Sequence, residues 1–252
     1  MRNALPCVGL TVLAGCFTFV IAPDELPTDG KSILEPTRFP MIVIDPGHGG
    51  NDVGGRSNGL VEKEITLDVA KRVNELLTRS GFDTKLTRTD DEYLSLEERS
   101  QVANGFDDAV FVSIHFNMDS SRDSSGVESY YARQKSPPEQ DWAFIGFFGA
   151  PAMELDSGED LAASIQDAVS RRTEARNRGI RAGNLYVVRN VKWPAVLVEG
   201  GFMSNPMEAK LLESGDYRDR MARGIAEGVM TYLKSRPTGD TPEVPQLAKA
   251  DR

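Results

Sequence analysis

The stretch that decides the fold occupies residues 41–50 and reads MIVIDPGHGG. Its first four residues are apolar and largely β-branched, Asp45 follows them, and Pro46-Gly47 ends the run, so the pattern predicts a short buried strand. His48 follows the end of this strand directly. Where helices connect the strands of a sheet, ligands bind beyond the carboxyl ends of the strands. His48 is therefore the first candidate functional residue.

Apolar and amphipathic segments alternate along the rest of the chain. Helical spacing of apolar side chains predicts a helix over 62–77, and the capping box that begins at Ser95 predicts another to about residue 104. Further strands are expected at 82–88, 109–114, 127–131, 185–188 and 195–199, and further helices at about 161–172 and 217–234. This alternation is typical of an α/β fold, and we expect a single domain with a mixed, mostly parallel sheet flanked by helices on both faces.

The ends of the chain differ in composition from its middle. Residues 23–40 and 235–252 are polar and contain several prolines, so we expect a linker and a disordered tail on either side of one folded domain over 41–234. Residues 1–22 start with a single positive charge and are then largely apolar, which is typical of an export signal. Their length is also close to that of a membrane span.

The leader contains the sequence Leu13-Ala14-Gly15-Cys16, which resembles the lipobox of bacterial lipoproteins, where the cysteine is lipidated. Residues 17–22 stay apolar after that cysteine, however, and a conventional cut after residue 22 would face Pro23. We expect export to the periplasm or cell envelope. Lipidation of Cys16 as a membrane anchor, an uncleaved leader, and a cytoplasmic protein with an apolar tail are the alternatives.

Charge and cysteine content restrict the chemistry. The formal net charge of −9 argues against a protein that binds nucleic-acid phosphates. Both cysteines, Cys7 and Cys16, lie in the leader, so the rest of the chain has neither a disulfide framework nor a thiolate ligand for a metal. A metal site would need histidines and carboxylates, and the chain has two histidines, His48 and His115.

Four residues with the right chemistry lie near expected strand ends. His115 follows the apolar run at 109–114, Glu199 closes the strand at 195–199, and Glu62 begins the helix that follows His48. Two imidazoles and one carboxylate are the protein ligands of a common hydrolytic zinc site, which leaves one position for water. A second carboxylate can take a proton from that water and deliver it to a leaving amine.

The third ligand is not decided by this pattern alone. Asp52 and Glu64 are alternatives to Glu62, which could also be a first-turn carboxylate that the helix dipole favours. A histidine in a loop is also often an ordinary hydrogen-bonding residue.

Four blocks of sequence resemble the signature blocks of zinc-dependent N-acetylmuramoyl-L-alanine amidases, which act on the bacterial cell wall. The blocks are IVIDPGHGG at 42–50, EK at 62–63, VSIHFN at 112–117 and PAVLVEGGFMSNP at 194–206, in the order and spacing of that family. The resemblance runs from about residue 41 to residue 233 and implies a mixed six-stranded sheet flanked by helices.

The resemblance also implies roles for individual residues. His48, Glu62 and His115 match the residues that bind Zn²⁺ in this family, and Glu199 matches the catalytic glutamate. It favours Glu62 over Glu64 because Lys63 follows Glu62, as in the family block.

The reaction implied is hydrolysis of the amide between the lactyl group of N-acetylmuramic acid and L-alanine of the peptidoglycan stem peptide, with Glu199 as the general base. Two alternatives remain open: another zinc peptidase or amidase that acts on wall peptides, and an inactive peptidoglycan-binding protein.

Several other polar residues have simpler interpretations. Asn117 and Arg178 are candidates for substrate contact, and otherwise for polar groups that stabilise loops. Asp45 and Ser113 are expected to form hydrogen bonds that support the site or the strand ends. Arg99 lies on a predicted helix, where a surface ion pair is expected.

The segment 132–159 departs from compact members of the family because it is longer. It contains two adjacent prolines, an apolar run at 142–148 and several acidic residues. Some family members carry an inserted helix at this point that blocks the zinc until an activator displaces it. We expect the insert to gate or shape the site, as a helix or as a loop, and a protein activator that acts on it is a candidate partner.

Overall fold

The structure is a computed structural model of the chain, and it describes residues 39–133, 158–236 and 247. All of these residues belong to one compact unit, Thr37–Arg252. The predicted leader, most of the predicted linker and tail, and residues 134–157 of the predicted insert lie outside the described residues. None of the helices in the described part of the chain is both long enough and apolar enough to cross a membrane.

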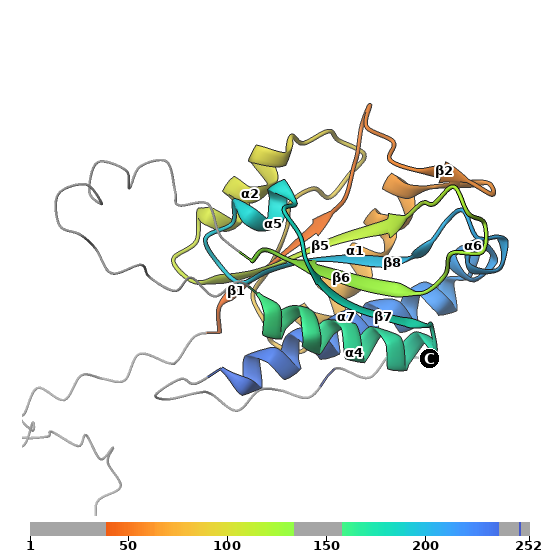
Figure 1. Ribbon diagram of the computed structural model, residues 1–252. Helices are drawn as coiled ribbons and strands as arrows, with labels where there is room; N and C mark the ends of the chain where they lie inside the picture. The colour runs from red at the N-terminus through yellow and green to blue at the C-terminus, as the bar shows by residue number, and fades with distance from the viewer. Residues whose placement is uncertain (1–38, 134–157, 237–246, 248–252) are drawn as a thin grey trace, which may run out of the picture. The chain divides into compact units, whose positions relative to one another are not determined.

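A six-stranded sheet forms the centre of this unit (Figure 1). Its strands are β1 (Met41–Pro46), β4 (Thr84–Leu86), β5 (Ala109–Asn117), β6 (Val127–Tyr131), β7 (Asn177–Ala182) and β8 (Ala195–Phe202). They lie in the order β4-β1-β5-β8-β6-β7. Four neighbouring pairs are parallel and one, β6 with β8, is antiparallel. The prediction of a mixed, mostly parallel six-stranded sheet is confirmed.

Helices cover both faces of the sheet, as predicted. Helices α1 (Glu62–Arg79), α4 (Glu159–Thr173) and α7 (Gly215–Ser235) pack on one face, where their apolar stripes and the β-branched residues of the central strands form the larger core. Helices α2 (Leu96–Asn104) and α5 (Tyr186–Arg189) lie on the other face with a smaller core (Figure 1). A short helix, α6 (Pro206–Glu213), precedes α7, and the hairpin of β2 (Arg56–Ser57) and β3 (Leu60–Val61) precedes α1.

Alternation along the strands determines which side chains reach each face. In β5, Val112 and Ile114 join the core beneath α1 and α7, whereas Phe111 joins the core beneath α2 and α5. Because successive side chains in a strand point to opposite faces, His115 shares the face of Phe111. In β8, Glu199 likewise shares the face of Leu197, which belongs to the smaller core. His115 and Glu199 therefore project from the same face of the sheet.

The prediction of a strand at 185–188 is wrong. These residues lead into the one-turn helix α5, whose Val187 and Val188 are buried against the smaller core. A four-residue apolar run does not distinguish a strand from a short buried helix. The sixth strand is instead β7, a polar edge strand that pairs with β6 and has no apolar alternation to reveal it.

Candidate active site

The loop after β1 presents His48 in a strained backbone conformation. His48 has a φ of 60°, and Gly49 beside it has a φ of 132°. Positive φ is uncommon for residues other than glycine and costs on the order of 1 kcal/mol or more, so the surrounding structure must hold the loop in place.

Two buried arginines provide that support. Arg99 donates to the carbonyl oxygens of Pro46 and His48, in both cases at 2.7 Å. Arg88 donates to the carbonyl oxygens of Pro46 at 3.1 Å and Gly47 at 2.8 Å. Every backbone carbonyl from residue 46 to residue 48 thus accepts a hydrogen bond from a guanidinium group, which fixes the position of the His48 side chain.

The expectation of a surface ion pair for Arg99 is wrong. Its side chain is 3% exposed and pairs at 2.8 Å with Asp45, which is fully buried. Asp45 also accepts hydrogen bonds from Ser113 at 2.7 Å and Thr87 at 2.6 Å. Asp45 and Ser113 form the supporting contacts that the sequence predicted. The sequence pattern of α2 does not reveal that Arg99 is buried, because its partner lies 54 positions earlier.

His48, Glu62 and His115 converge at one point. Oε1 of Glu62 lies 3.1 Å from Nε2 of His48 and 3.1 Å from Nδ1 of His115. The candidate ligand atoms of the three residues all lie within 4.8 Å of one another. Tetrahedral zinc with bonds of about 2.1 Å places its ligand atoms about 3.4 Å apart. The spacing and the N, N, O donor set therefore fit a zinc ion.

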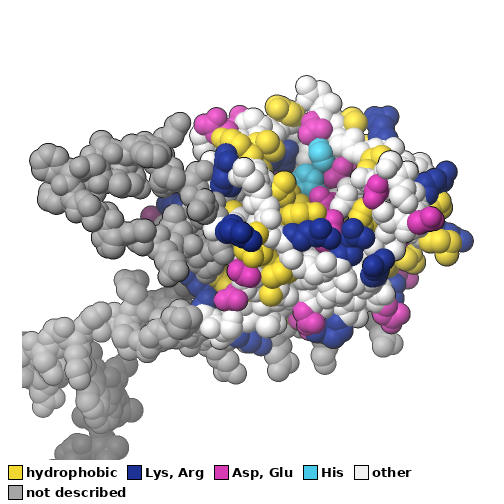
Figure 2. All heavy atoms as spheres, viewed as in Figure 1, with side chains coloured by type: hydrophobic (Ala, Val, Ile, Leu, Met, Phe, Trp, Pro, Cys, Tyr) yellow, Lys and Arg dark blue, Asp and Glu magenta, His cyan; other side chains and the backbone are white. Residues whose placement is uncertain are grey.

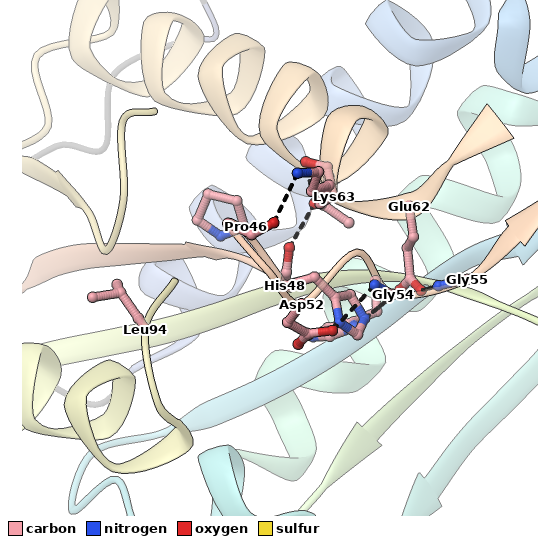
Figure 3. A network of polar contacts seen from close by, with 12 residues as sticks. Pro46, His48, Asp52, Gly54, Gly55, Glu62, Lys63 and Leu94 are labelled. Carbon is pink, nitrogen blue, oxygen red and sulfur yellow. Dashed lines mark hydrogen bonds and ion pairs between the residues drawn. The ribbon is translucent and has the colours of Figure 1, made fainter. Parts of the chain in front are cut away.

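Surrounding groups orient the side chains of His48 and Glu62 (Figure 3). Nδ1 of His48 lies 2.9 Å from Oδ2 of Asp52, so a hydrogen bond at this nitrogen leaves Nε2 facing Glu62. Oε2 of Glu62 accepts from the backbone N–H of Gly55 at 2.7 Å. Asp52 therefore supports His48 from behind rather than joining the cluster, and Glu64 is exposed on the outside of α1. Such outer contacts fix the tautomer and orientation of a ligand histidine.

Glycines make room for the cluster. A Cβ at Gly47 would collide with the ring of His115, and a Cβ at Gly54 would lie 2.6 Å from both Oε2 of Glu62 and Cδ2 of His48. The close packing of backbone against the three side chains leaves them little freedom to turn away from one another. The close approach of Gly47 and Gly54 to these side chains is a second observation that fits a metal centre.

The electrostatics of the cluster favour a bound cation. Burial opposes ionisation of Glu62, but hydrogen bonds from His115 and His48 outweigh it and hold the pKa of this carboxyl well below its usual range. Burial also opposes the charged form of His48, yet its hydrogen bond and charge interaction with Glu62 raise the pKa of the imidazole. A carboxylate held in its charged form between two imidazoles suits a divalent cation, which binds deprotonated ligands.

Glu199 lies next to this cluster in the sheet. Its Cα is paired with that of His115 across β8 and β5. Oε2 of Glu199 is buried and has no hydrogen-bond partner among the residues that the structure describes. Burial raises the pKa of Glu199 to about 7. An unpaired carboxylate that exchanges a proton near neutral pH is suited to general acid–base chemistry.

The cluster is open to solvent. The side chains of His48 and His115 are 22% and 20% exposed, whereas that of Glu62 is 7% exposed. Figure 2 shows histidine side chains at the surface beside acidic side chains, with a row of Lys and Arg side chains on the same face. A substrate can therefore approach the histidines from this face.

Asn117 and Arg178 meet at a residue that the sequence did not single out. Asn117 donates to Oε1 of Glu128 at 2.8 Å, and Nε of Arg178 donates to Oε2 of Glu128 at 3.0 Å. Glu128 is 3% exposed and lies in β6, where its Cα is paired with that of Glu199. The one signal in the sequence is an acidic residue at an inward position of a predicted strand.

Comparisons of the chain with known proteins all point to the same family. The family described as N-acetylmuramoyl-L-alanine amidase matches residues 42–231. The N-acetylmuramoyl-L-alanine amidase LytC of Bacillus subtilis is 36% identical over 204 residues, which are 81% of this chain and 38% of LytC. The chain thus spans well under half the length of that relative.

Two solved structures match most of this chain. The N-acetylmuramoyl-L-alanine amidase of Clostridium difficile 630 has a TM-score of 0.68 and 33% identity, and the match covers 78% of this chain and 98% of that one. The CwlD amidase of Clostridioides difficile, solved in complex with the GerS lipoprotein, has a TM-score of 0.67 and 28% identity over 79% of this chain and 100% of its own.

Proposed function

The chain belongs to the N-acetylmuramoyl-L-alanine amidase family, and on that premise we propose that it is a zinc enzyme that hydrolyses the amide between the lactyl group of N-acetylmuramic acid and L-alanine of the stem peptide. The observation that carries this proposal is the convergence of His48, Glu62 and His115 beside the unpaired carboxylate of Glu199. The substrate is then peptidoglycan, as expected for a relative of N-acetylmuramoyl-L-alanine amidases.

His48, Glu62 and His115 would hold the zinc through Nε2, Oε1 and Nδ1, the atoms that face one another. Zinc bound there would polarise the scissile carbonyl and lower the pKa of a water molecule toward neutrality. A hydrogen bond from Nδ1 of His48 to Asp52 would leave Nε2 available to the zinc, and the backbone N–H of Gly55 holds the second oxygen of Glu62. The two arginines behind the loop keep these atoms in place while substrate binds and leaves.

Glu199 is the proposed general base. Its free oxygen takes a proton from the attacking water, and the protonated carboxyl then delivers that proton to the nitrogen of L-alanine as the amide bond breaks. A pKa near 7 suits both halves of this cycle, because the group exchanges a proton readily at neutral pH. A bound cation would lower that pKa and favour the basic form at the start of the cycle.

Asn117 and Arg178 are proposed to lie along the bound peptide. Asn117 ends β5, the strand that carries His115, whereas Arg178 lies on the edge strand β7, and both side chains donate hydrogen bonds to Glu128. The hydrogen bonds to Glu128 keep their side chains in defined positions at the edge of the site.

Purified sacculi provide the test of this function. An amidase of this class releases stem peptides with a free L-alanine amino terminus and leaves the glycan strands intact. Another wall peptidase would release peptides that end elsewhere, and an inactive wall-binding protein would release none. Either of those results refutes the proposed reaction.

The relatives support a protein of the cell envelope, and we propose that residues 1–22 direct export, with Cys16 as a lipidation site and membrane anchor. Loss of membrane fractionation in Cys16→Ser would support the anchor, and unchanged fractionation would refute it. We also propose a protein activator that acts on the 132–159 insert. The CwlD amidase was solved in complex with the GerS lipoprotein, so a relative of similar fold has a protein partner.

A further inference from the structure

The edge strand β7, on the side of the sheet toward β8 and Glu199, carries two arginines that share one carboxylate oxygen. Nε of Arg178 lies 3.0 Å and Nε of Arg181 lies 3.2 Å from Oε2 of Glu128. Glu128 is the one carboxylate that pairs with Arg181 in the part of the chain that the structure describes. Two guanidinium groups and a single carboxylate leave one positive charge uncompensated.

The carboxylate of Glu128, which holds the two arginines, is itself fixed by other hydrogen bonds. Oε1 of Glu128 accepts from Asn117 at 2.8 Å and from the hydroxyl of Tyr130 at 3.0 Å, so both oxygens of the buried carboxylate are occupied. Arg178 also lies over the ring of Phe202, 4.8 Å from its centroid. The positions of Glu128 and of the Arg178 guanidinium are therefore set before any ligand arrives, and Arg181 is tethered to Glu128 through one contact. Such preorganisation lowers the entropic cost of binding.

The two arginines differ in what remains available for a ligand. Arg178 is 24% exposed and donates a further hydrogen bond to the carbonyl oxygen of Ser125. Arg181 is 51% exposed and contacts Glu128 through Nε at 3.2 Å. Its terminal N–H groups are thus the exposed donors of the pair. A planar guanidinium with free terminal N–H groups binds carboxylates through paired hydrogen bonds.

The distance from the proposed zinc site fits a short peptide. In the sheet order, β6 lies two strands from β5, which carries His115. Strands lie about 4.8 Å apart, so the backbone of Glu128, which is in register with Glu199 and His115, lies roughly 10 Å from that of His115. The arginines come from β7, one strand further, and their guanidinium groups reach back to Glu128. An extended peptide covers about 3.5 Å per residue, so two to three residues beyond the scissile amide would reach Arg181.

We propose that Arg181, held by Glu128 together with Arg178, binds a free carboxylate on the peptide side of the substrate, within the first three residues after the cleaved amide. This inference rests on the proposed amidase function and adds a recognition site to it. Arg181 binds substrate, whereas Glu128 positions the arginines. The site would favour acidic stem peptides over amidated ones.

The test uses the full chain and two N-acetylmuramoyl tripeptides, one with free carboxylates and one with the same carboxylates converted to carboxamides. We expect the protein to prefer the acidic tripeptide by about tenfold in kcat/KM, mainly through a lower KM, because a charge-assisted hydrogen bond is lost on amidation. Arg181→Ala should abolish this preference by raising KM for the acidic tripeptide alone, with kcat unchanged.

A matched control is Arg79→Ala. Arg79 is 49% exposed and pairs with Glu75, but it lies at the opposite end of α1 from Glu62, about 26 Å along the helix. This variant should keep the full preference. Zinc content measured on all three proteins distinguishes loss of recognition from damage to the metal site.

The outcomes separate the two proposals. Equal losses on both tripeptides in Arg181→Ala, or an unchanged preference for the acidic one, would overturn the role of Arg181 while leaving the amidase function in place. Failure of the parent protein to cleave either tripeptide or sacculi would overturn the amidase function, and this inference with it.

Discussion

Glu128 and Glu199 occupy directly opposed positions on the antiparallel strands β6 and β8. Like charges in opposed positions are destabilising unless they are compensated. Two arginines and two neutral donors surround Glu128, whereas Oε2 of Glu199 has no partner within the described residues. Different surroundings thus separate the two carboxylates into one that anchors side chains and one that can exchange a proton.

Removal of Arg99 should destabilise the fold. Arg99→Ala leaves the fully buried Asp45 without its ion-pair partner and removes the hydrogen bonds to the carbonyl oxygens of Pro46 and His48. Breaking a buried pair from one side costs about 3–5 kcal/mol. We expect the free energy of unfolding in urea to fall by that amount, and zinc affinity to fall as well because the His48 loop is released.

The control for this prediction is Arg79→Ala, which removes an exposed ion pair with Glu75. Its cost should be below about 1 kcal/mol. Similar costs for the two variants would show that the contacts of Arg99 do not contribute to stability in the way described.

Gly47 is expected to be essential for the metal site. A Cβ at this position would collide with the ring of His115, and φ at Gly47 is not positive, so Gly47→Ala tests steric contact alone. We expect the ring to move away from Glu62 and zinc affinity, measured by competition with a chelator, to fall at least about tenfold, a change of about 1.4 kcal/mol.

Gly105→Ala is the matched control for Gly47→Ala. Gly105 lies at the end of α2 with a helical φ of −73°, and the nearest atom to an added Cβ would be 3.5 Å away. This variant should bind zinc like the parent protein. If Gly47→Ala also keeps full affinity, the proposed packing of His115 is incorrect.

Asp68 links stability to pH. Burial alone would raise the pKa of Asp68, but hydrogen bonds from Arg72 and Arg218 outweigh it and hold the pKa below its ordinary value. A carboxyl whose pKa is lower in the folded state stabilises the fold above its unfolded pKa, about 4, and this contribution is lost as the pH falls through the folded value.

The lowered pKa of Asp68 in the folded state determines the expected effect of Asp68→Asn on stability. At pH 7 the variant should lose less than about 1 kcal/mol, because the carboxylate is 38% exposed and screened by solvent. The difference from the parent protein should shrink as the pH of the unfolding experiment is lowered below 4. Asp107→Asn, at an exposed aspartate in a bend, is the control. A difference that grows toward low pH would contradict the assignment.

The parts of the fold with strong local signals could be predicted from sequence. The apolar runs at β1, β5 and β8 and the helical stripe of α1 depend on neighbouring residues, and they predict His48, Glu62, His115 and Glu199 at strand and helix ends. Strands β5 and β8 in fact continue past His115 to Asn117 and past Glu199 to Phe202. The edge strand β7 is polar and the run at 185–188 is too short to decide between strand and helix, so their positions depend on tertiary packing.

The supporting contacts of the site were harder to predict for a similar reason. Arg99 meets Asp45 across 54 positions, and Arg178 meets Glu128 across 50 positions. No local spacing specifies such pairs. The burial of a charged side chain becomes visible only when the distant partner that compensates it is placed beside it.

The most direct test of the account compares zinc content and turnover in the same preparations of the parent protein and of Glu199→Gln, with His115→Ala as the metal-site control. We expect Glu199→Gln to keep one zinc ion per chain and to lose at least about a hundredfold in kcat, because the general base is gone. His115→Ala should lose the zinc itself. A Glu199→Gln protein that cleaves the lactyl–alanine amide at the parent rate would contradict the account.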